Sequence, residues 1–594
     1  MATIPEALVL AIQHHQAGRL HAAEQIYRQI LQAEPNQPDA LHLLGVIAYQ
    51  VGRHEAAVEY IGRAIGLKAG EAAFHNNLGE AYRALRRIPE AVACYRRALE
   101  LKPDYAEAHN NLGIALKDQG KPDQAVACYR RALELRPDYA KTHSNLGVAL
   151  WELGKLDEAV ACYRRALELE PDQAEVHSNL GIALMDRGNL DEAVAACRRA
   201  LELKPDLAEV HENFGAALHA QGKLDEAVAC FRRALELKPD YAQAINNLGV
   251  ALSDQGKLDD VVACYRRALE LSPDYADAHV NQAIWSLLTG DFQRGWSEYE
   301  WRWKAKLSQQ RDFSQALWQG QPLEGRTILL HAEQGLGDAI QFVRYAPLVK
   351  RQGGTVVVEC PRPLVSLLRS CAGIDRLVGR GDELPPFDLQ APLLSLPGIF
   401  RTTLQDIPAA VPYLFADPGL AERWRRELGG MAGFKIGVAW QGNPKYRSDR
   451  DRSIPAACFE PLARCCGVQL LSLQKRWGIE QLQEVSGRFP VVDLGSRLDE
   501  ASGAFMDTAA VMLNLDLVVT SDTAIAHLAG ALGVPVWVAI SFIPDWRWLL
   551  ERSDSPWYPT MRLFRQDRRG DWQGVFRRIE AAAGEHVAGR NNLA

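Results

Sequence analysis

The sequence lacks an excess of positive charge. Its 67 lysines and arginines stand against 74 aspartates and glutamates, which gives a formal net charge of -7. Nucleic-acid binding needs a basic surface that neutralises phosphates. We therefore expect no nucleic-acid partner.

Long hydrophobic runs are also absent. The longest extends from Leu528 to Ile543 and contains Gly530, Gly533 and Pro535, so it is too short and too broken to cross a bilayer. The N-terminal segment lacks the basic start and small-residue cleavage site of a signal peptide. We expect a cytoplasmic protein without a membrane span.

Cysteine spacings typical of disulfide frameworks or zinc sites are missing, although there are eleven cysteines. Cys465 and Cys466 have neither CxxC spacing nor a nearby histidine, so we expect no metal. Five other cysteines lie a repeat apart, too far for disulfides, and we expect reduced thiols. These five are Cys94, Cys128, Cys162, Cys230 and Cys264.

What the sequence does contain is a repeat of 34 residues. Proline recurs at 103, 137, 171, 205, 239 and 273, and glycine at 45, 79, 113, 147, 181, 215 and 249. This is the period of tetratricopeptide (TPR) helix hairpins. In one unit, Gly113 and Ala125 are small where helices approach, Tyr129 fills the gap and Pro137 follows the second helix. The pattern predicts an α-solenoid over residues 4–309, a TPR superhelix of about nine units with a degenerate last one.

Two polar residues recur within the repeat. Six histidines occupy one position, a repeat apart, which favours packing at unit interfaces over a shared metal ion. Seven asparagines precede the Leu-Gly pair, and their amides could bind an extended peptide backbone. Duplication could also have copied a neutral asparagine. The histidines are His75, His109, His143, His177, His211 and His279, and the asparagines are Asn77, Asn111, Asn145, Asn179, Asn213, Asn247 and Asn281.

This row of asparagines resembles the asparagine row in the TPR superhelix of O-GlcNAc transferase, over roughly residues 72 to 285. This resemblance implies a protein or peptide partner in the TPR groove.

Five tryptophans lie where the repeats end. They predict a hydrophobic junction that docks the array on the next domain, with a sugar-stacking platform as the alternative. Residues 310–326 are expected to be a linker. The tryptophans are Trp285, Trp296, Trp301, Trp303 and Trp318.

After residue 327 short apolar runs alternate with amphipathic stretches. The runs begin at residues 327, 355, 435, 468 and 515, a βα pattern that predicts parallel sheets. Because the pattern restarts at Lys435, we expect two Rossmann-like halves, 327–430 on the acceptor side and 431–594 on the nucleotide-sugar side, with the ligand between them.

A turn with two glycines follows the first predicted strand. Gly335 and Gly337 resemble a dinucleotide fingerprint, but Ile340 replaces its third glycine. Asp338 should lie at the start of the following helix, as an active-site carboxylate or as a helix cap. Glu333, just upstream, is the alternative base.

The segment Ser521 to His527 follows a strand and begins a helix. A helix N-terminus exposes backbone N–H groups to anions, and Thr523 adds a hydroxyl, so a diphosphate would fit here. A catalytic triad is excluded because the residues lie within one or two turns. The predicted site residues are Ser521, Asp522, Thr523, Ala524, Ile525 and His527.

The loop after the strand at 435 contains four cations in residues 441–453. Lys445 and Arg452 could neutralise a leaving diphosphate, although a solvated surface loop is the alternative. Asp449 and Asp451 match a metal-binding DxD, which we interpret as coincidence. Gln474 and Lys475, at the end of the next strand, should lie near the nucleotide base or ribose.

Taken in order, these elements resemble the heptosyltransferase-like glycosyltransferase family 9 over roughly residues 327 to 575. The resemblance implies a GT-B fold, inversion at the anomeric carbon and no metal or other cofactor. It implies that Asp338 is the base, that Asp522 to Ile525 contact diphosphate and sugar, and that Arg452 or Lys445 binds phosphate. Ala524 departs from the family's frequent glycine, and the arginine-rich loop is longer.

The sequence as a whole predicts a glycosyltransferase that uses a nucleotide-sugar donor and holds a protein acceptor in its TPR array. The plan is similar to that of O-GlcNAc transferase. Two alternatives stay open. One is a non-catalytic TPR scaffold with a degenerate sugar-nucleotide domain, and the other is a transferase acting on a glycan or lipid-linked acceptor.

Overall fold

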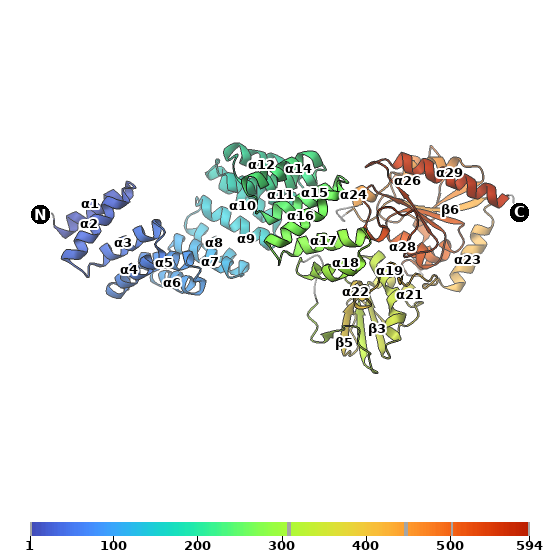
Figure 1. Ribbon diagram of the computed structural model, residues 1–594, viewed down its shortest axis with the longest axis horizontal. Coiled ribbons are helices and arrows are strands. Elements are labelled where there is room, and N and C mark those ends of the chain that lie inside the picture. The colour runs from blue at the N-terminus through green and yellow to red at the C-terminus, as the bar shows by residue number, and fades with distance from the viewer. Residues whose placement is uncertain (1–2, 306–310, 445–448, 501–502, 592–594) are drawn as a thin grey trace. The chain divides into compact units, whose positions relative to one another are not determined.

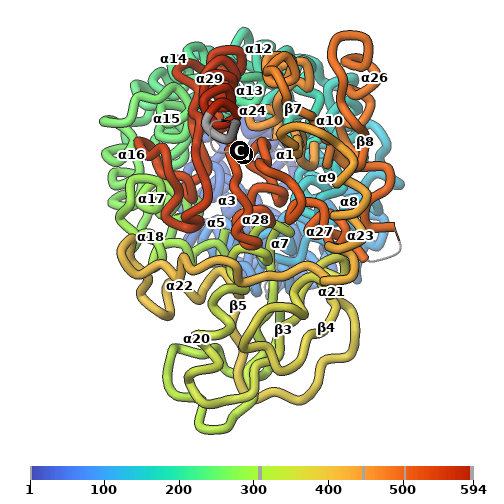
Figure 2. Tube along the Cα trace, turned by 90° about the vertical axis from the view of Figure 1, so that its right-hand side faces the viewer, coloured from blue at the N-terminus to red at the C-terminus, as the bar shows by residue number. Residues whose placement is uncertain are grey.

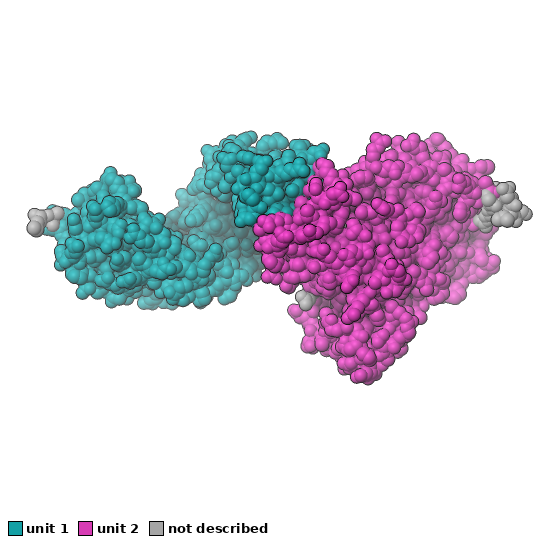
Figure 3. Space-filling model, viewed as in Figure 1, with its two compact units in different colours: residues 1–251 teal, residues 252–594 magenta. Residues whose placement is uncertain are grey.

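The computed structural model describes residues 3–305, 311–444, 449–500 and 503–591. It divides into two compact units, residues 1–251 and 252–594 (Figure 3). Each unit is described by itself.

The first unit is built from paired helices. Gly113 shows why the pairs form, because a Cβ atom there would lie 2.5 Å from Tyr129 Cε1 on the partner helix. Small residues at this point allow the close approach. Successive pairs stack side by side (Figure 1). The helices are α1 (Ile4–Gln16), α2 (Leu20–Ala33), α3 (Pro38–Gln50), α4 (His54–Leu67), α5 (Ala72–Ala84), α6 (Ile88–Leu101), α7 (Ala106–Asp118), α8 (Pro122–Leu135), α9 (Ala140–Glu152), α10 (Leu156–Leu169), α11 (Ala174–Arg187), α12 (Leu190–Leu203), α13 (Ala208–Ala220), α14 (Leu224–Leu237) and α15 (Ala242–Asp254), whose last residues belong to the second unit.

The same pattern continues in α16 (Leu258–Leu271), α17 (Ala276–Leu288) and α18 (Phe292–Tyr299). The predicted helical solenoid is confirmed.

The repeated histidines join neighbouring repeats by hydrogen bonds. In each, Nε2 lies between 2.8 and 3.0 Å from the carbonyl oxygen six residues earlier, as in His143 with Pro137. Within the described residues no three metal-ligating side chains form a group. The cysteines described there are free thiols.

The rest of the second unit contains two parallel sheets. The segments of β3, β4 and β5, from the first sheet, lie together in the lower part of Figure 2. The first has the order β1-β5-β2-β3-β4 and the second β11-β10-β9-β6-β7-β8. The second order is that of a doubly wound sheet, 3-2-1-4-5-6. The strands are β1 (Ala316–Leu317), β2 (Thr327–His331), β3 (Thr355–Cys360), β4 (Arg376–Gly379), β5 (Leu389–Pro392), β6 (Phe434–Ala439), β7 (Val468–Ser472), β8 (Val492–Asp493), β9 (Leu517–Ser521), β10 (Val536–Ile540) and β11 (Met561–Arg565).

Helices and 3₁₀ turns connect these strands. Strand β1 pairs with β5, so part of the predicted linker at 310–326 is instead an edge strand. The helices are α19 (Leu336–Phe342), α20 (Ala346–Lys350), α21 (Val365–Leu368), α22 (Leu396–Ile399), α23 (Pro418–Gly429), α24 (Asp449–Arg452), α25 (Glu460–Arg464), α26 (Gln481–Val485), α27 (Met506–Met512), α28 (Ala524–Ala531) and α29 (Trp572–Asn591), and the turns are η1 (Glu300–Trp303), η2 (Val343–Tyr345), η3 (Arg362–Leu364), η4 (Leu393–Ser395), η5 (Ala456–Phe459), η6 (Gly495–Arg497) and η7 (Trp546–Trp548).

The predicted tryptophan junction is confirmed. Trp296 on α18 is buried, its Nε1 donates to the Thr402 carbonyl at 3.0 Å, and its ring lies 5.3 Å from that of Trp546. The last TPR helices therefore pack directly on the sheet-containing part of the second unit. None of the described helices is long and apolar enough to span a bilayer.

Candidate functional site

Parallel sheets bind ligands outside the carboxyl ends of their strands, where the strand order reverses. In the second sheet that point lies between β6 and β9, which are followed by the segments starting at Trp440 and Asp522. In the first sheet, β2 leads into the turn that contains Glu333 and Asp338. The predicted base and diphosphate residues therefore follow the strands that this rule selects, whereas Gln474 and Lys475 follow the neighbouring strand β7.

The two turns meet where α19 contacts α28. A Cβ atom at Gly337 would lie 2.9 Å from His527 Cδ2, so glycine is needed for this approach. His527 is buried, with Nδ1 3.0 Å from the Tyr558 hydroxyl. Burial holds the pKa of His527 well below its usual value, so the imidazole is neutral. It forms part of the contact between the sheets.

Asp338 is held by an arginine from the other half. Its Oδ1 lies 2.5 Å from Arg547 Nη2, and its Oδ2 accepts from the Gly335 amide at 2.8 Å. Burial raises the pKa of Asp338 and the Arg547 guanidinium opposes that rise. Asp338 therefore caps its helix and also faces the other half, so both interpretations of this residue have a structural basis.

Sequence reasoning missed Arg547. This buried guanidinium also donates to Asp545 Oδ1 at 2.8 Å and to Gln341 Oε1 at 2.6 Å. The strand-end rule could have selected Arg547, because Asp545 and Arg547 follow β10, another strand whose carboxyl end points to this region.

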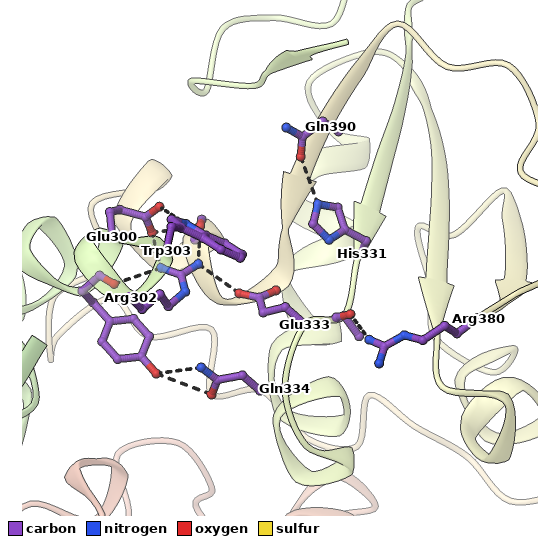
Figure 4. Close-up of polar contacts among 11 residues, drawn as sticks. Glu300, Arg302, Trp303, His331, Glu333, Gln334, Arg380 and Gln390 are labelled. Carbon is purple, nitrogen blue, oxygen red and sulfur yellow. Dashed lines mark hydrogen bonds and ion pairs between the residues drawn. The ribbon is translucent and has the colours of Figure 1, made fainter. Parts of the chain in front are cut away.

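Glu333 is enclosed at the junction with the TPR array. Its Oε1 lies 2.9 Å from Nη2 of Arg302 in η1, which also donates to Ser395 Oγ at 2.8 Å (Figure 4). Burial raises the pKa of Glu333 to about 7, and Arg302 opposes the rise. The exposed fraction of the side chain is 3% for Glu333 and 20% for Asp338. Of the two predicted bases, Asp338 is therefore the more accessible from outside the protein.

The structure brings Arg452 and Thr523 together. A Cβ atom at Gly442 would lie 2.8 Å from Arg452 Nη2 and 3.4 Å from Thr523 Cγ2. Among the described residues, the buried hydroxyl oxygens of Ser521 and Thr523 have no hydrogen-bond partner. A cation and two hydroxyls beside a helix start suit an anion. Arg452 also pairs with Asp449 at 3.2 Å, and Lys445 lies outside the described residues.

Asp522 adds negative charge to this region. Burial and the neighbouring Asp545 raise its pKa to about 6, whereas Arg452 and Arg547 lower it. Thr523 is the N-cap of α28, and Ala524 and Ile525 form its first turn. A carboxylate here repels a diphosphate, so Asp522 suits the hydroxyls of a sugar better.

The side-chain amide of Gln474 forms hydrogen bonds with backbone groups of the neighbouring turns. Its Oε1 accepts from the amides of Trp440 and Gln441 at 2.8 and 3.1 Å, and its Nε2 donates to the carbonyls of Gln441 and Trp477 at 2.9 and 2.8 Å. Lys475 Nζ donates to the Leu498 carbonyl. Both side chains therefore help to fix the turns, and their contact with a nucleotide stays a prediction.

Several repeated asparagines connect neighbouring repeats. Asn145 Nδ2 donates to Asn110 Oδ1 at 3.0 Å, 35 residues earlier. Asn77, Asn111, Asn213 and Asn247 donate to equivalent positions, and Asn179 and Asn281 occupy the same place on α11 and α17. Each amide nitrogen has a second hydrogen, so peptide binding stays a prediction alongside this structural role.

At one of these positions the acceptor of the hydrogen bond between repeats is a carboxyl group. Glu212 is buried, its Oε1 accepts from Asn247 Nδ2 at 2.6 Å, and its Oε2 has no partner among the described residues. Burial raises the pKa of Glu212 to about 7.

We expect Glu212→Gln to stabilise the TPR array above pH 7. The folded chain binds the proton of the Glu212 carboxyl group more tightly than the unfolded chain. The free energy of unfolding of the wild type is therefore highest below the ordinary pKa of 4.5 and falls as the pH rises to about 7. The loss amounts to about 3 kcal/mol. The variant should match the wild type near pH 4.5 and melt at a higher temperature at pH 8 in circular dichroism. Glu209→Gln, at an exposed position of the same helix, is the control, and an equal gain there would contradict the assignment.

Comparisons with known proteins identify the first half. Residues 14–76 match the tetratricopeptide repeat family model, and residues 68–284 match that of the cilia and flagella-associated protein 70 C-terminal domain, a TPR model. Residues 14–284 are tetratricopeptide repeats. The chain is also similar to Protein FlbA of Caulobacter vibrioides, with 26% identity over 329 residues, covering 51% of this chain and 54% of FlbA. It thus spans about half the length of this curated relative.

Solved structures match parts of the chain. YrrB, described as a TPR protein with an unusual peptide-binding site, is 24% identical and covers 32% of this chain and 97% of its own, with a TM-score of 0.28. MamA is 27% identical, covering 28% and 96%, with a TM-score of 0.26. PilF of Pseudomonas aeruginosa is 21% identical, covering 36% and 96%, with a TM-score of 0.32.

Proposed function

We propose that this protein is an inverting, metal-independent glycosyltransferase of the GT-B class, which moves a sugar from a nucleotide diphosphate donor to an acceptor hydroxyl. One observation carries the proposal. A carboxylate from the first sheet, Asp338, and a cation and hydroxyl from the second, Arg452 and Thr523, follow strand ends that meet where α19 contacts α28.

In the proposed reaction, Asp338 accepts the proton of the acceptor hydroxyl. The hydroxyl oxygen bonds to the anomeric carbon from the face opposite the leaving group, and the bond to the diphosphate oxygen breaks, leaving its electron pair on the diphosphate. Arg452, the Thr523 hydroxyl and the start of α28 stabilise that charge. The raised pKa of Asp338 makes its carboxylate a stronger base.

We further propose that the TPR array binds a protein or peptide acceptor. The described peptide-binding site of the similar protein YrrB supports this role for TPR repeats. Direct packing of α18 on the sheet-containing region supports transfer to a bound acceptor, because Trp296 of this last TPR helix is held against Thr402 and Trp546.

A specific observation favours the scaffold alternative. Asp338 is already paired with Arg547 at 2.5 Å, and Arg452 with Asp449 at 3.2 Å. Each of these charges is neutralised by a partner within the protein, without a substrate. This is also expected for a domain that binds a sugar nucleotide but does not catalyse transfer. A glycan or lipid-linked acceptor is the remaining alternative.

The test is to incubate the full-length protein with a panel of nucleotide sugars and measure release of the nucleoside diphosphate. We expect release with at least one donor and none above background for Asp338→Ala. Absence of release with every donor would contradict the enzymatic proposal and leave the scaffold. Release that requires added glycan rather than protein would favour the other acceptor class.

A further inference from the structure

Trp477 differs from the other tryptophans of the sheet-containing region. Its side chain is 39% exposed, whereas the other eight that follow residue 310 are buried. They are Trp318, Trp424, Trp440, Trp537, Trp546, Trp548, Trp557 and Trp572. An exposed indole is not by itself a site, since single apolar side chains are common on surfaces. The backbone that carries this indole adds the second observation.

The turn that carries Trp477 is fixed on both sides. The Trp477 carbonyl accepts from Gln474 Nε2 at 2.8 Å, and the next carbonyl, that of Gly478, accepts from Trp440 Nε1 at 3.0 Å. Arg476 has a φ of 65°, in the left-handed region that ordinary residues rarely adopt. The two hydrogen bonds thus hold the backbone of the turn in place, including the unfavourable conformation of Arg476, while Trp477 is left exposed.

The turn lies next to the proposed diphosphate site. A side chain at Gly478 would collide with Gln441. The residue after Gln441 is Gly442, where a Cβ atom would lie 2.8 Å from Arg452 Nη2 and 3.4 Å from Thr523 Cγ2. Strands β7, β6 and β9 are consecutive in the sheet, so the ends of β7 and β9 lie about 10 Å apart. This separation suits the base and the phosphates of one nucleotide.

We propose that Trp477 is the stacking platform for the nucleobase of the donor. The inference rests on the proposed function. It keeps the predicted place of the nucleotide base near the end of β7 but assigns the contact to Trp477, which sequence reasoning did not name. Stacking on an indole face needs no base-specific hydrogen bond, so Trp477 gives affinity for the base, while Arg452 and Thr523 bind the phosphates.

The experiment measures binding by isothermal titration calorimetry on the full-length protein, with UDP, GDP, ADP and dTDP, and with inorganic pyrophosphate as a probe without a base. We expect Trp477→Ala to bind the preferred nucleotide about ten- to a hundred-fold more weakly and pyrophosphate as tightly as the wild type. Trp477→Phe should recover much of the nucleotide affinity. Arg452→Ala should weaken both probes.

Trp151→Ala is the matched control, because Trp151 is 37% exposed on the TPR helix α9. It should leave both affinities unchanged, and unchanged melting temperatures should show that all variants fold. If the wild type binds a nucleotide and Trp477→Ala binds it equally well, or loses pyrophosphate in parallel, the stacking role is wrong. If the wild type binds no nucleotide, the proposed function itself fails.

Discussion

Asp338→Asn is expected to lower kcat for sugar transfer by about 10²–10⁴-fold, the usual contribution of a general base. Asparagine has nearly the same shape and can accept from Arg547, but it cannot take the acceptor proton. The acidic limb of the wild-type pH profile should lie above the ordinary aspartate pKa, because burial raises the pKa of Asp338. Release of nucleoside diphosphate, followed against pH, measures both effects.

Glu333→Gln is the comparison that separates the two predicted bases. Glu333 is nearly enclosed and paired with Arg302, so its amide variant should retain most of the kcat. A loss confined to Glu333→Gln, with Asp338→Asn active, would transfer the base role to Glu333. Calorimetric titration with nucleotide should show that Asp338→Asn still binds, which separates lost chemistry from lost binding.

Arg302→Met is expected to destabilise the second unit by about 3–5 kcal/mol at pH 8, the effect of removing one partner of a buried ion pair. Arg302 is fully buried between Glu300, Glu333 and Ser395. Because the pKa of Glu333 is about 7, this carboxylate is ionised at pH 8 and largely protonated at pH 6. The loss should therefore be smaller at pH 6. Denaturant unfolding at both pH values measures it.

Two further variants test the cause of this loss. Arg302→Met with Glu333→Gln should be more stable than Arg302→Met alone, because no uncompensated Glu333 carboxylate remains. Arg362→Met removes an exposed arginine that pairs with exposed Asp382, and should change stability by at most about 1 kcal/mol. Equal losses for Arg302→Met and Arg362→Met would show that the buried network contributes nothing special.

Local patterns predicted the elements well. The spacing of Gly113, Tyr129 and Pro137 predicted the helix pairs because each pair packs residues close in sequence. The apolar runs at 327 and 435 predicted strands of parallel sheets. A Cβ atom at Gly442 would approach both Arg452 and Thr523, two residues predicted to bind one diphosphate, and this binding stays a prediction.

Side-chain roles within the site were harder to predict. Gln474 follows a strand end, as predicted, but its amide is satisfied by backbone groups of neighbouring turns. The period of the repeated asparagines predicted a row of polar side chains. It could not show that several of them donate hydrogen bonds to residues 35 positions earlier, in the preceding repeat. Such pairings depend on the angle between neighbouring helices, which no single repeat contains.

The sequence by itself determined the TPR hairpins and the two sets of parallel strands, because period and hydrophobic pattern act over short stretches of chain. Only the tertiary structure decided which charges are paired. Arg547 reaches Asp338 across 209 residues and Arg302 reaches Glu333 across 31. Burial then sets the pKa values of both carboxyl groups. Pairing and burial arise when distant segments exclude water together, a property of the packed chain that no local pattern records.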